Sequence, residues 1–139
     1  MRTETNKSVL RRYIDELNNR NVAILDELVA DEFREGVRRG YCSKVAAFPD
    51  YFVEVQGMIA EGDQVAVEWT YRGIHRGPYE GIPPTGKSIA GRVITIYRVV
   101  DGRITGSRGV SEPGEICHQL GSSSEIDEAR EPGKPGSGS

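Results

Sequence analysis

The sequence contains few of the residues on which metal sites, disulfide frameworks and nucleic-acid interfaces depend. Its 139 residues include two histidines and two cysteines, Cys42 and Cys117. Two cysteines make neither a disulfide framework nor a zinc site, so we expect buried thiols in a reducing compartment. The 18 Lys and Arg residues are outnumbered by 21 Asp and Glu and form no basic block. The composition therefore argues against metal and against a nucleic-acid partner.

Long apolar runs are also absent. No stretch approaches the length that spans a bilayer. The first 19 residues are charged and lack the continuous apolar segment of a signal peptide. We therefore expect a cytoplasmic protein with no membrane contact.

What the sequence does contain suits one globular domain and a polar tail. It is 37% hydrophobic and 28% charged, which is ordinary for a folded domain. Residues 122–139 have almost no apolar side chains and are rich in Ser, Glu, Gly and Pro. Such a segment cannot bury enough surface to fold. We expect a domain over residues 1–121 and a disordered polar tail over 122–139.

The first third of the domain has a helical pattern. Apolar residues between 9 and 17 recur at intervals of three and four, with charged residues between them. Asn6 is the expected N-cap of this helix. A second short helix is predicted within residues 22–29, and a third within 34–48, ending before Pro49.

Strands are expected from Phe52 onward. Residues 64–75 alternate, and one face carries Val65, Val67, Trp69, Tyr71 and His75. Residues 91–100 are rich in β-branched side chains, and the Asp101-Gly102 pair that follows is typical of a hairpin turn. Helices followed by an antiparallel meander predict an α+β fold. Helices on one face of a curved sheet would leave a concave pocket.

The stretch "GIPPTGKS" at 81–88 matches the pattern of a nucleotide phosphate-binding loop. Pro83 and Pro84 lack the N–H groups that such a loop presents to phosphate, and the next residues have strand character rather than helix character. We therefore interpret the stretch as a rigid connection between two strands. In it, Gly86 takes a positive φ and Lys87 is solvated.

Several motifs occur in succession: "AAFPD" at 46–50, "EGDQVAVEW" at 61–69, "GIHRG" at 73–77, "GIPPTGK" at 81–87 and "YRVVDGRI" at 97–104. Over residues 7–121 the chain resembles the SnoaL-like polyketide cyclase family of the nuclear-transport-factor-two-like superfamily. The resemblance implies a cone-shaped α+β barrel, with three N-terminal helices packed on a strongly curved antiparallel sheet and an apolar pocket at the open end. It also implies a homodimer that pairs through the outer sheet face, and a small hydrophobic substrate.

The same resemblance implies proton-transfer chemistry that needs no metal or organic cofactor. In the family a pattern like E-x-W-x-x-x-D supplies an acidic side chain. Here Glu112 stands at the position of the Asp, while Gly106 and Arg108 replace the Glu and the Trp. Glu112 is thus either the catalytic acid or base, or a surface carboxylate at a strand end. Arg108, four residues earlier, is expected on the same face, where an ion pair would favour a base.

A second departure from the family lies near residues 31–36. Relatives carry a strand and a loop after the second helix, whereas here "ADEF" runs straight into "REGVRRGY". A shortened pocket wall would either widen the mouth for a bulky substrate or impair the site.

The remaining candidates are a histidine and several aromatic residues. His75 either contacts a substrate oxygen as a second catalytic residue or is a satisfied structural residue. The candidate substrate-binding residues are Tyr71, Trp69, Tyr97, Tyr13, Tyr41 and Arg108. Trp69 and Tyr71 fit a plain core role equally well. Tyr97 and Arg92 lie on opposite faces of their strand, so at most one of them points inward.

Two functions follow from these observations. The first is a cofactor-independent cyclase or isomerase of secondary metabolism, such as antibiotic biosynthesis. It would close a ring by an aldol reaction, or by opening an epoxide, in a polyketide-like intermediate. The second is a non-catalytic ligand-binding or assembly protein on the same fold.

Overall fold

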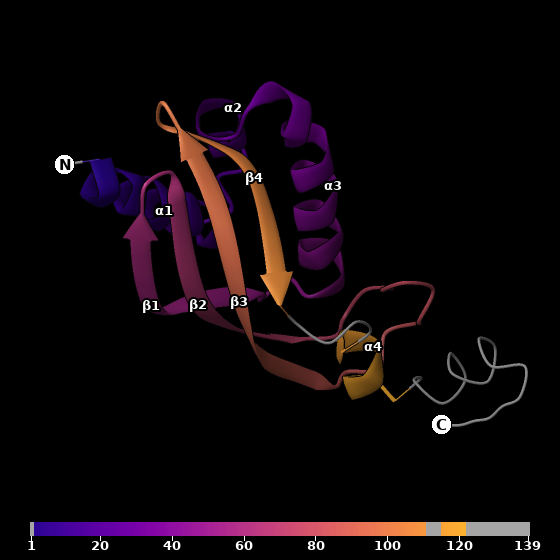
Figure 1. Cartoon of the computed structure of the whole chain (residues 1–139). Coiled ribbons are helices and arrows are strands. Elements are labelled where there is room, and N and C mark those ends of the chain that lie inside the picture. Colours follow the sequence, from indigo (N-terminus) through magenta and orange to yellow (C-terminus); the bar gives the residue numbers. More distant parts are fainter. Residues whose placement is uncertain (1, 111–114, 122–139) are drawn as a thin grey trace, which may run out of the picture.

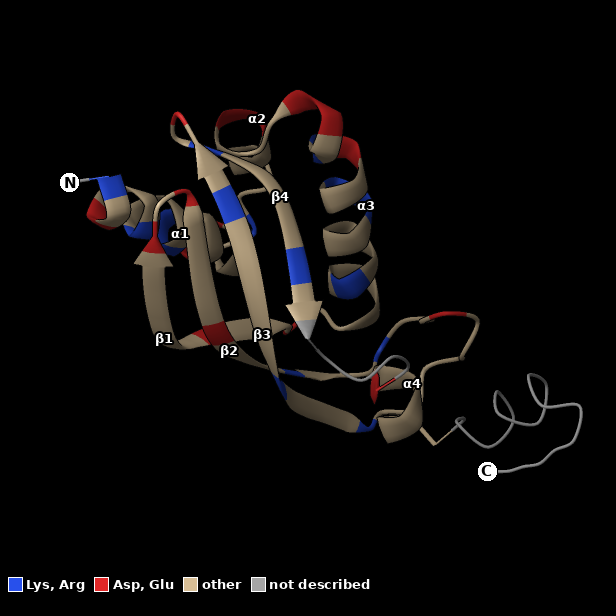
Figure 2. Cartoon of the chain, viewed as in Figure 1, with Lys and Arg blue, Asp and Glu red and all other residues tan. Residues whose placement is uncertain are grey.

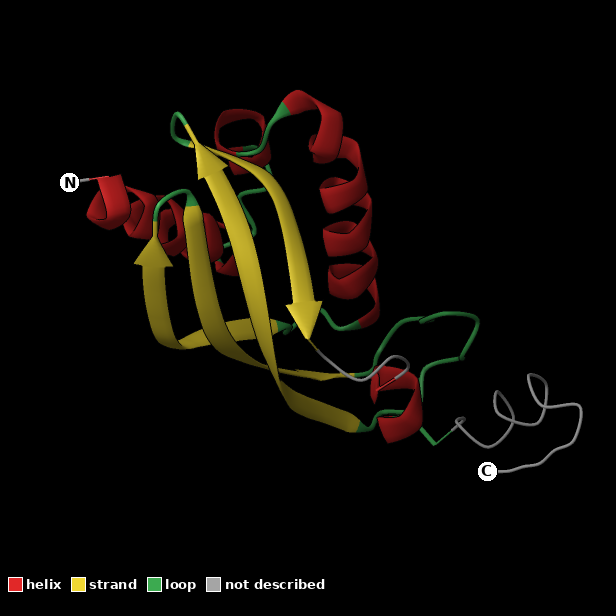
Figure 3. Cartoon of the chain, viewed as in Figure 1, coloured by secondary structure: helices red, strands yellow, loops and turns green. Residues whose placement is uncertain are grey.

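The computed structural model describes residues 2–110 and 115–121, and helices precede strands along most of the chain (Figure 1, Figure 3). The elements are α1 (Arg2–Asn18), α2 (Ile24–Leu28), α3 (Asp31–Ala47), β1 (Phe52–Glu61), β2 (Gln64–Ile74), β3 (Ser88–Val100), β4 (Arg103–Val110) and α4 (Glu115–Gln119). This order confirms the predicted α+β class. The expected tail, residues 122–139, lies outside the described residues. Within them, no helix has the length and apolar character needed to cross a bilayer.

The sheet is an antiparallel meander in the order β1-β2-β3-β4. The long strands β2 and β3 pair along their whole lengths, from Gln64 opposite Arg98 to Ile74 opposite Ser88. Both strands bend strongly, so the sheet curves around the helices (Figure 1). Within the described residues β1 and β4 remain edge strands, so the predicted cone-like curvature is present in a sheet that does not close into a barrel.

Two tight turns fix the register of this sheet. Asp101 and Gly102 have φ angles of 52° and 78°, as a two-residue hairpin turn with positive φ at both positions requires. Gly62, in the β1–β2 turn, has φ 58°. The hairpin predicted from the Asp-Gly pair is confirmed.

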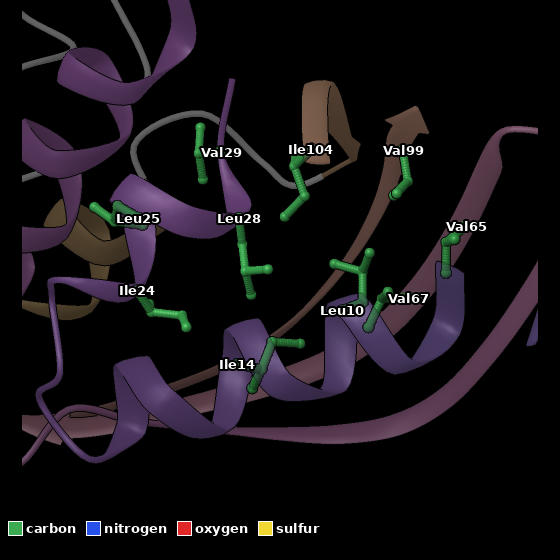
Figure 4. Packing of buried hydrophobic residues seen from close by; sticks show 10 residues of the cluster. All are labelled: Leu10, Ile14, Ile24, Leu25, Leu28, Val29, Val65, Val67, Val99 and Ile104. Carbon is green, nitrogen blue, oxygen red and sulfur yellow. The ribbon is translucent and has the colours of Figure 1, made fainter. Parts of the chain in front are cut away.

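The inner face of β2 packs on the helices. Val65, Val67, Tyr71 and His75 are buried, while Arg72 between them is exposed, which confirms the alternation predicted for this strand. One cluster of buried side chains joins α1, α2 and the sheet (Figure 4): Leu10, Ile14, Ile24, Leu25, Leu28, Val29, Val65, Val67, Val99 and Ile104. Burying each of the larger side chains contributes about 1.5–3 kcal/mol to the stability of the fold. This cluster therefore holds α1 across the concave face.

A second cluster lies at the other end of the sheet. It consists of Ala47, Phe48, Tyr51, Tyr71, Ile89 and Leu120. Gln119 of α4 accepts a hydrogen bond from the backbone N–H of Ala90 at 2.8 Å and donates one to the Tyr71 hydroxyl at 3.2 Å. These contacts dock α4 against the beginning of β3.

The helix boundaries correct two predictions. Helix α1 begins at Arg2, so Asn6 is inside the helix rather than its N-cap; its buried side chain donates to the carbonyl of Gly62 at 3.4 Å. Helix α3 spans Asp31–Ala47, so it begins three residues before the predicted range 34–48. Just before this helix, Val29 forms a single-residue parallel bridge with Ile104. The region near 31–36 is therefore helical, and the chain before it contributes one bridge to the edge of β4.

The stretch 81–88 connects β2 to β3. Gly86 has φ 75°, its N–H donates to the carbonyl of His75, and the His75 N–H donates to the carbonyl of Lys87. Strand β3 begins at Ser88, where a phosphate-binding loop would open a helix. The interpretation as a connection between two strands is confirmed, and its rigidity stays a prediction.

Candidate functional site

A pocket of about 210 Å³ lies between the helices and the concave face of the sheet. The α1 side contributes Tyr13, Ile14, Leu17, Asn18 and, after the helix, Arg20. The α3 side contributes Val37, Gly40, Tyr41 and Lys44. The sheet side contributes Tyr51, Val53, Trp69 and Tyr97. An apolar, aromatic lining with a few polar groups is typical of a small-molecule site.

Four of the residues predicted from the sequence meet in this pocket: Tyr13, Tyr41, Trp69 and Tyr97. The Tyr13 and Tyr97 rings pack edge to face, with their centroids 6.1 Å apart. The Trp69 indole donates to the Thr95 hydroxyl at 2.9 Å, which fixes the ring against the sheet. The face that carries Tyr97 is thus the inner one, and Arg92 on the opposite face is exposed.

The tyrosine hydroxyls of the pocket are hydrogen-bond donors at neutral pH. Burial raises the pKa of Tyr13 and of Tyr51 well above the usual range, and it raises the pKa of Tyr97 to about 12. The Tyr41 hydroxyl already donates to the carbonyl of Leu17 at 2.8 Å. Within the described residues Tyr13 and Tyr51 have no such acceptor, so both can donate to a ligand oxygen.

Two polar residues that sequence reasoning missed give the pocket its shape. Asn18 exchanges two hydrogen bonds with the backbone of Val53, at 2.7 and 3.0 Å. Arg20, which has φ 67°, donates to the carbonyls of Pro49 and Tyr51 at 2.7 and 2.8 Å. Together they hold the end of α1 against the beginning of β1. The only sequence signal at these residues was the helix-breaking "NNRN" at 18–21, which predicts a turn but not hydrogen bonds to a distant strand.

Lys44 and Tyr51 were also missed. Lys44 follows Tyr41 by one helical turn, a spacing that places both on one face of α3. Burial lowers the pKa of Lys44, against a smaller opposing effect of Glu80. Its ammonium lies over the Tyr51 ring, 5.9 Å from the centroid.

The structure does not bring His75 to the pocket. Its side chain is 0% exposed and lies next to the ring of Phe48, a member of the second cluster. The backbone N–H of Thr85 donates to its Nδ1 at 3.1 Å, and the Thr85 hydroxyl lies 3.0 Å from the same atom. Its Nε2 is buried and has no hydrogen-bond partner among the described residues, so His75 is only partly the satisfied structural residue of the alternative. A catalytic role for His75 stays a prediction, and its position outside the pocket lining does not support that role.

Tyr71 lies behind the pocket rather than in its lining. Its ring stacks on that of Tyr51 at 6.2 Å between centroids, and its hydroxyl accepts a hydrogen bond from Gln119. Tyr71 also covers Gly91, where an added Cβ would come within 2.5 Å of the tyrosine hydroxyl. Tyr71 thus supports the pocket wall through Tyr51.

Arg108 lies on the outer face of the sheet. It pairs with Ile96 across β3 and β4, and its guanidinium donates to the Gln64 side chain at 3.2 Å. The inner face at this level belongs to Tyr97, so Arg108 does not reach the pocket, contrary to its prediction as a substrate-binding residue. Glu112 lies outside the described residues.

The described lining of the pocket carries two cations and no carboxylate. Arg20 and Lys44 supply the charge. The described residues also contain no cluster of His, Cys, Asp and Glu able to hold a metal ion. The site can therefore polarise and hold a ligand oxygen, but its described part lacks an acidic side chain for proton transfer.

The family model for SnoaL-like polyketide cyclases matches residues 7–120. The chain belongs to this family. No curated protein matches it in sequence. A candidate SnoaL-like polyketide cyclase from Jannaschia sp. CCS1 superposes with a TM-score of 0.77 at 20% identity, over 85% of this chain and 92% of the other.

Two solved structures from Streptomyces resemble this SnoaL-like domain as well. IdmH of S. antibioticus, a candidate polyketide cyclase, has a TM-score of 0.72 and 26% identity over 84% of this chain and 98% of its own. AclR of S. galilaeus, a candidate hydroxylase, has a TM-score of 0.71 and 23% identity over 86% and 97%. Because the names of these neighbours differ in reaction, the SnoaL-like fold alone does not assign one.

Proposed function

We propose that the protein is a cofactor-independent cyclase or isomerase that acts by acid/base catalysis on a polyketide-like hydrophobic molecule. The observation that carries this proposal is the aromatic pocket on the concave face of a SnoaL-like domain, with protonated hydroxyls of Tyr13 and Tyr51 available as donors. Such a site suits a ring-bearing ligand that is rich in carbonyl oxygens.

The proposed chemistry begins at a carbonyl group of the ligand. Hydrogen bonds from Tyr13 and Tyr51 to its oxygen would stabilise the charge that develops there. A base then removes a proton from the adjacent carbon, and the electrons of that C–H bond form the enolate. In an aldol closure this carbon attacks a second carbonyl, whose oxygen takes up a proton. Glu112 remains the proposed acid and base. In an epoxide opening it would protonate the epoxide oxygen as the C–O bond breaks, while an internal hydroxyl of the ligand attacks that carbon and loses its proton to water.

The test is proton exchange in a simple ketone. The methyl protons of 2-acetylnaphthalene should exchange with D₂O faster with the protein than in buffer, as measured by ¹H NMR. Glu112→Gln should slow this exchange by about a hundredfold, while Glu61→Gln, at an exposed strand end outside the pocket lining, should leave it unchanged. Full exchange in the Glu112→Gln variant would remove Glu112 from the mechanism.

A second candidate function is binding without catalysis. The absence of a carboxylate from the described pocket lining favours it. In that case 2-acetylnaphthalene would bind, as seen by its effect on the Trp69 indole signal, with no acceleration of exchange. Binding with exchange supports the enzyme, and binding alone supports the carrier.

We also propose a homodimer that pairs through the outer sheet face. Ile59 and Ile94 are 73% and 45% exposed on this face, and Ala66 and Ile96 continue the row that begins at Ile59. Apolar side chains exposed on one face of a sheet are typical of an interface. Cytoplasmic location likewise stays a prediction.

Ile59→Lys should weaken this dimer by at least about tenfold, because the interface would bury an unpaired ammonium. Sedimentation velocity over a concentration series measures the change. Ser43→Lys, exposed on α3, adds the same charge away from the sheet and should leave the dimer intact. A wild-type protein that is monomeric at all concentrations would exclude the dimer.

A further inference from the structure

Lys44 is a cation at the pocket wall that forms no ion pair with any described residue. It lies near the end of α3, and its ammonium lies over the ring of Tyr51. Among the described residues its ammonium makes no hydrogen bond or ion pair, whereas its backbone carbonyl accepts the N–H of Phe48. Removing an ammonium group from water without a hydrogen-bonding partner costs free energy, and the same burial lowers the pKa of Lys44.

No neighbouring charged residue supplies the missing ion-pair partner of Lys44. Arg20 is a second cation, and its guanidinium is committed to backbone carbonyls. Glu80, on the loop after β2, acts on Lys44 through space but is exposed and forms no ion pair with it. Asp31 and Glu32 lie at the opposite end of α3, where Figure 2 shows the acidic segments of this helix.

The described part of the pocket lining thus combines an unpaired ammonium at Lys44 with the aromatic rings of Trp69 and Tyr97. The backbone carbonyls at the C-terminal end of α3 favour a cation at Lys44, which helps to keep this charge in place. An aromatic ligand that carries an ionised oxygen could place its rings against Trp69 and Tyr97 and its charge at Lys44. A neutral ligand of the same shape would leave the ammonium unpaired.

We propose that Lys44 binds an anionic oxygen group of the ligand, so that the pocket selects ring-bearing hydrophobic acids over their neutral analogues. This inference rests on the proposed function only in taking the same pocket as the ligand site. It adds the class of ligand, and it assigns Lys44 as a residue that determines specificity.

A matched pair of probes tests the proposal: 2-naphthoate, which is an anion, and 2-naphthamide, which is neutral and has the same rings. The chain has one tryptophan, Trp69, which lines the pocket. The indole N–H signal in a ¹H–¹⁵N spectrum of the labelled full chain therefore reports binding at this site alone. The naphthoate should bind the wild-type protein about tenfold more tightly than the amide, as a charged hydrogen bond implies.

Lys44→Met removes the charge and keeps an unbranched apolar side chain. It should weaken naphthoate about tenfold, leave naphthamide within about twofold, and unfold at a temperature no lower than the wild type. Lys44→Arg should keep the preference for the anion. Arg39→Met, exposed on the same helix and outside the lining, removes one positive charge and should change neither affinity.

The outcomes separate this inference from the proposed function. Naphthamide binding with no preference for naphthoate, or a preference that survives Lys44→Met, overturns the inference and leaves the pocket as a ligand site. Equal losses in Lys44→Met and Arg39→Met overturn it too, because the effect would then be one of net charge. If neither probe moves the Trp69 signal, both the inference and the proposed site are wrong.

Discussion

Gly40→Phe is expected to abolish ligand binding while the protein stays folded. Gly40 lies on α3 in the pocket lining, and a Cβ built there meets no atom within 4 Å. A phenyl ring can therefore enter the space that the ligand needs without displacing the protein. We expect the affinity for 2-naphthamide to fall by about a hundredfold, measured by titration of the Trp69 indole signal.

Gly36→Phe is the matched control for this prediction. Gly36 is on the same helix one turn earlier, has the same open surroundings and does not line the pocket. Both substitutions replace a helical glycine, so both should raise the free energy of unfolding by about 0.5 kcal/mol. Equal binding by the two variants would mean that the ligand site is elsewhere.

The inner lining of the pocket was accessible from the sequence because alternation is a local property. Trp69 shares one face of β2 with Val65 and Val67 because side chains alternate along a strand, and the buried valines identify that face as the inner one. Tyr13 shares the apolar stripe of α1 in the same way. No knowledge of the strand pairing is needed for either residue.

Arg108 shows where such reasoning fails. Ile104 is buried opposite Val99, so simple alternation would also place Arg108 on the inner face. The register shifts there, because Arg98 pairs with Gly106 and one residue of β4, Thr105, is left over. A β-bulge reverses the faces of all later residues in the strand. The sequence carries no clear signal for this bulge.

The roles of Asn18 and Arg20 could not be predicted from the sequence for a different reason. Both side chains form hydrogen bonds with backbone groups 29–35 residues away. Contacts between distant segments depend on the tertiary fold, which local patterns do not specify. Lys44 was missed because a lysine on an exposed helix is normally solvated, and only its position against Tyr51 distinguishes it.

His75→Ala is expected to be the most destabilising single change at a predicted site residue. The imidazole is 0% exposed, and its Nδ1 accepts the backbone N–H of Thr85 on the far side of the β2–β3 loop. Truncation leaves a cavity beside Phe48 and an unpaired N–H. We expect the free energy of unfolding to fall by about 2–4 kcal/mol in urea denaturation.

His75→Asn separates the structural role from a catalytic one. The Asn side chain is short and neutral, but its oxygen can take the place of Nδ1 as the acceptor for Thr85, so part of the lost stability should return. If His75 only holds the loop, proton exchange in 2-acetylnaphthalene should recover in proportion to the folded fraction. An asparagine cannot relay a proton as an imidazole can, so it would not restore a catalytic role. If His75→Asn were as stable as the wild type but did not catalyse exchange, the imidazole would be part of the chemistry despite its position outside the pocket. If stability and proton exchange recovered together, the role of His75 would be to hold the β2–β3 loop in place.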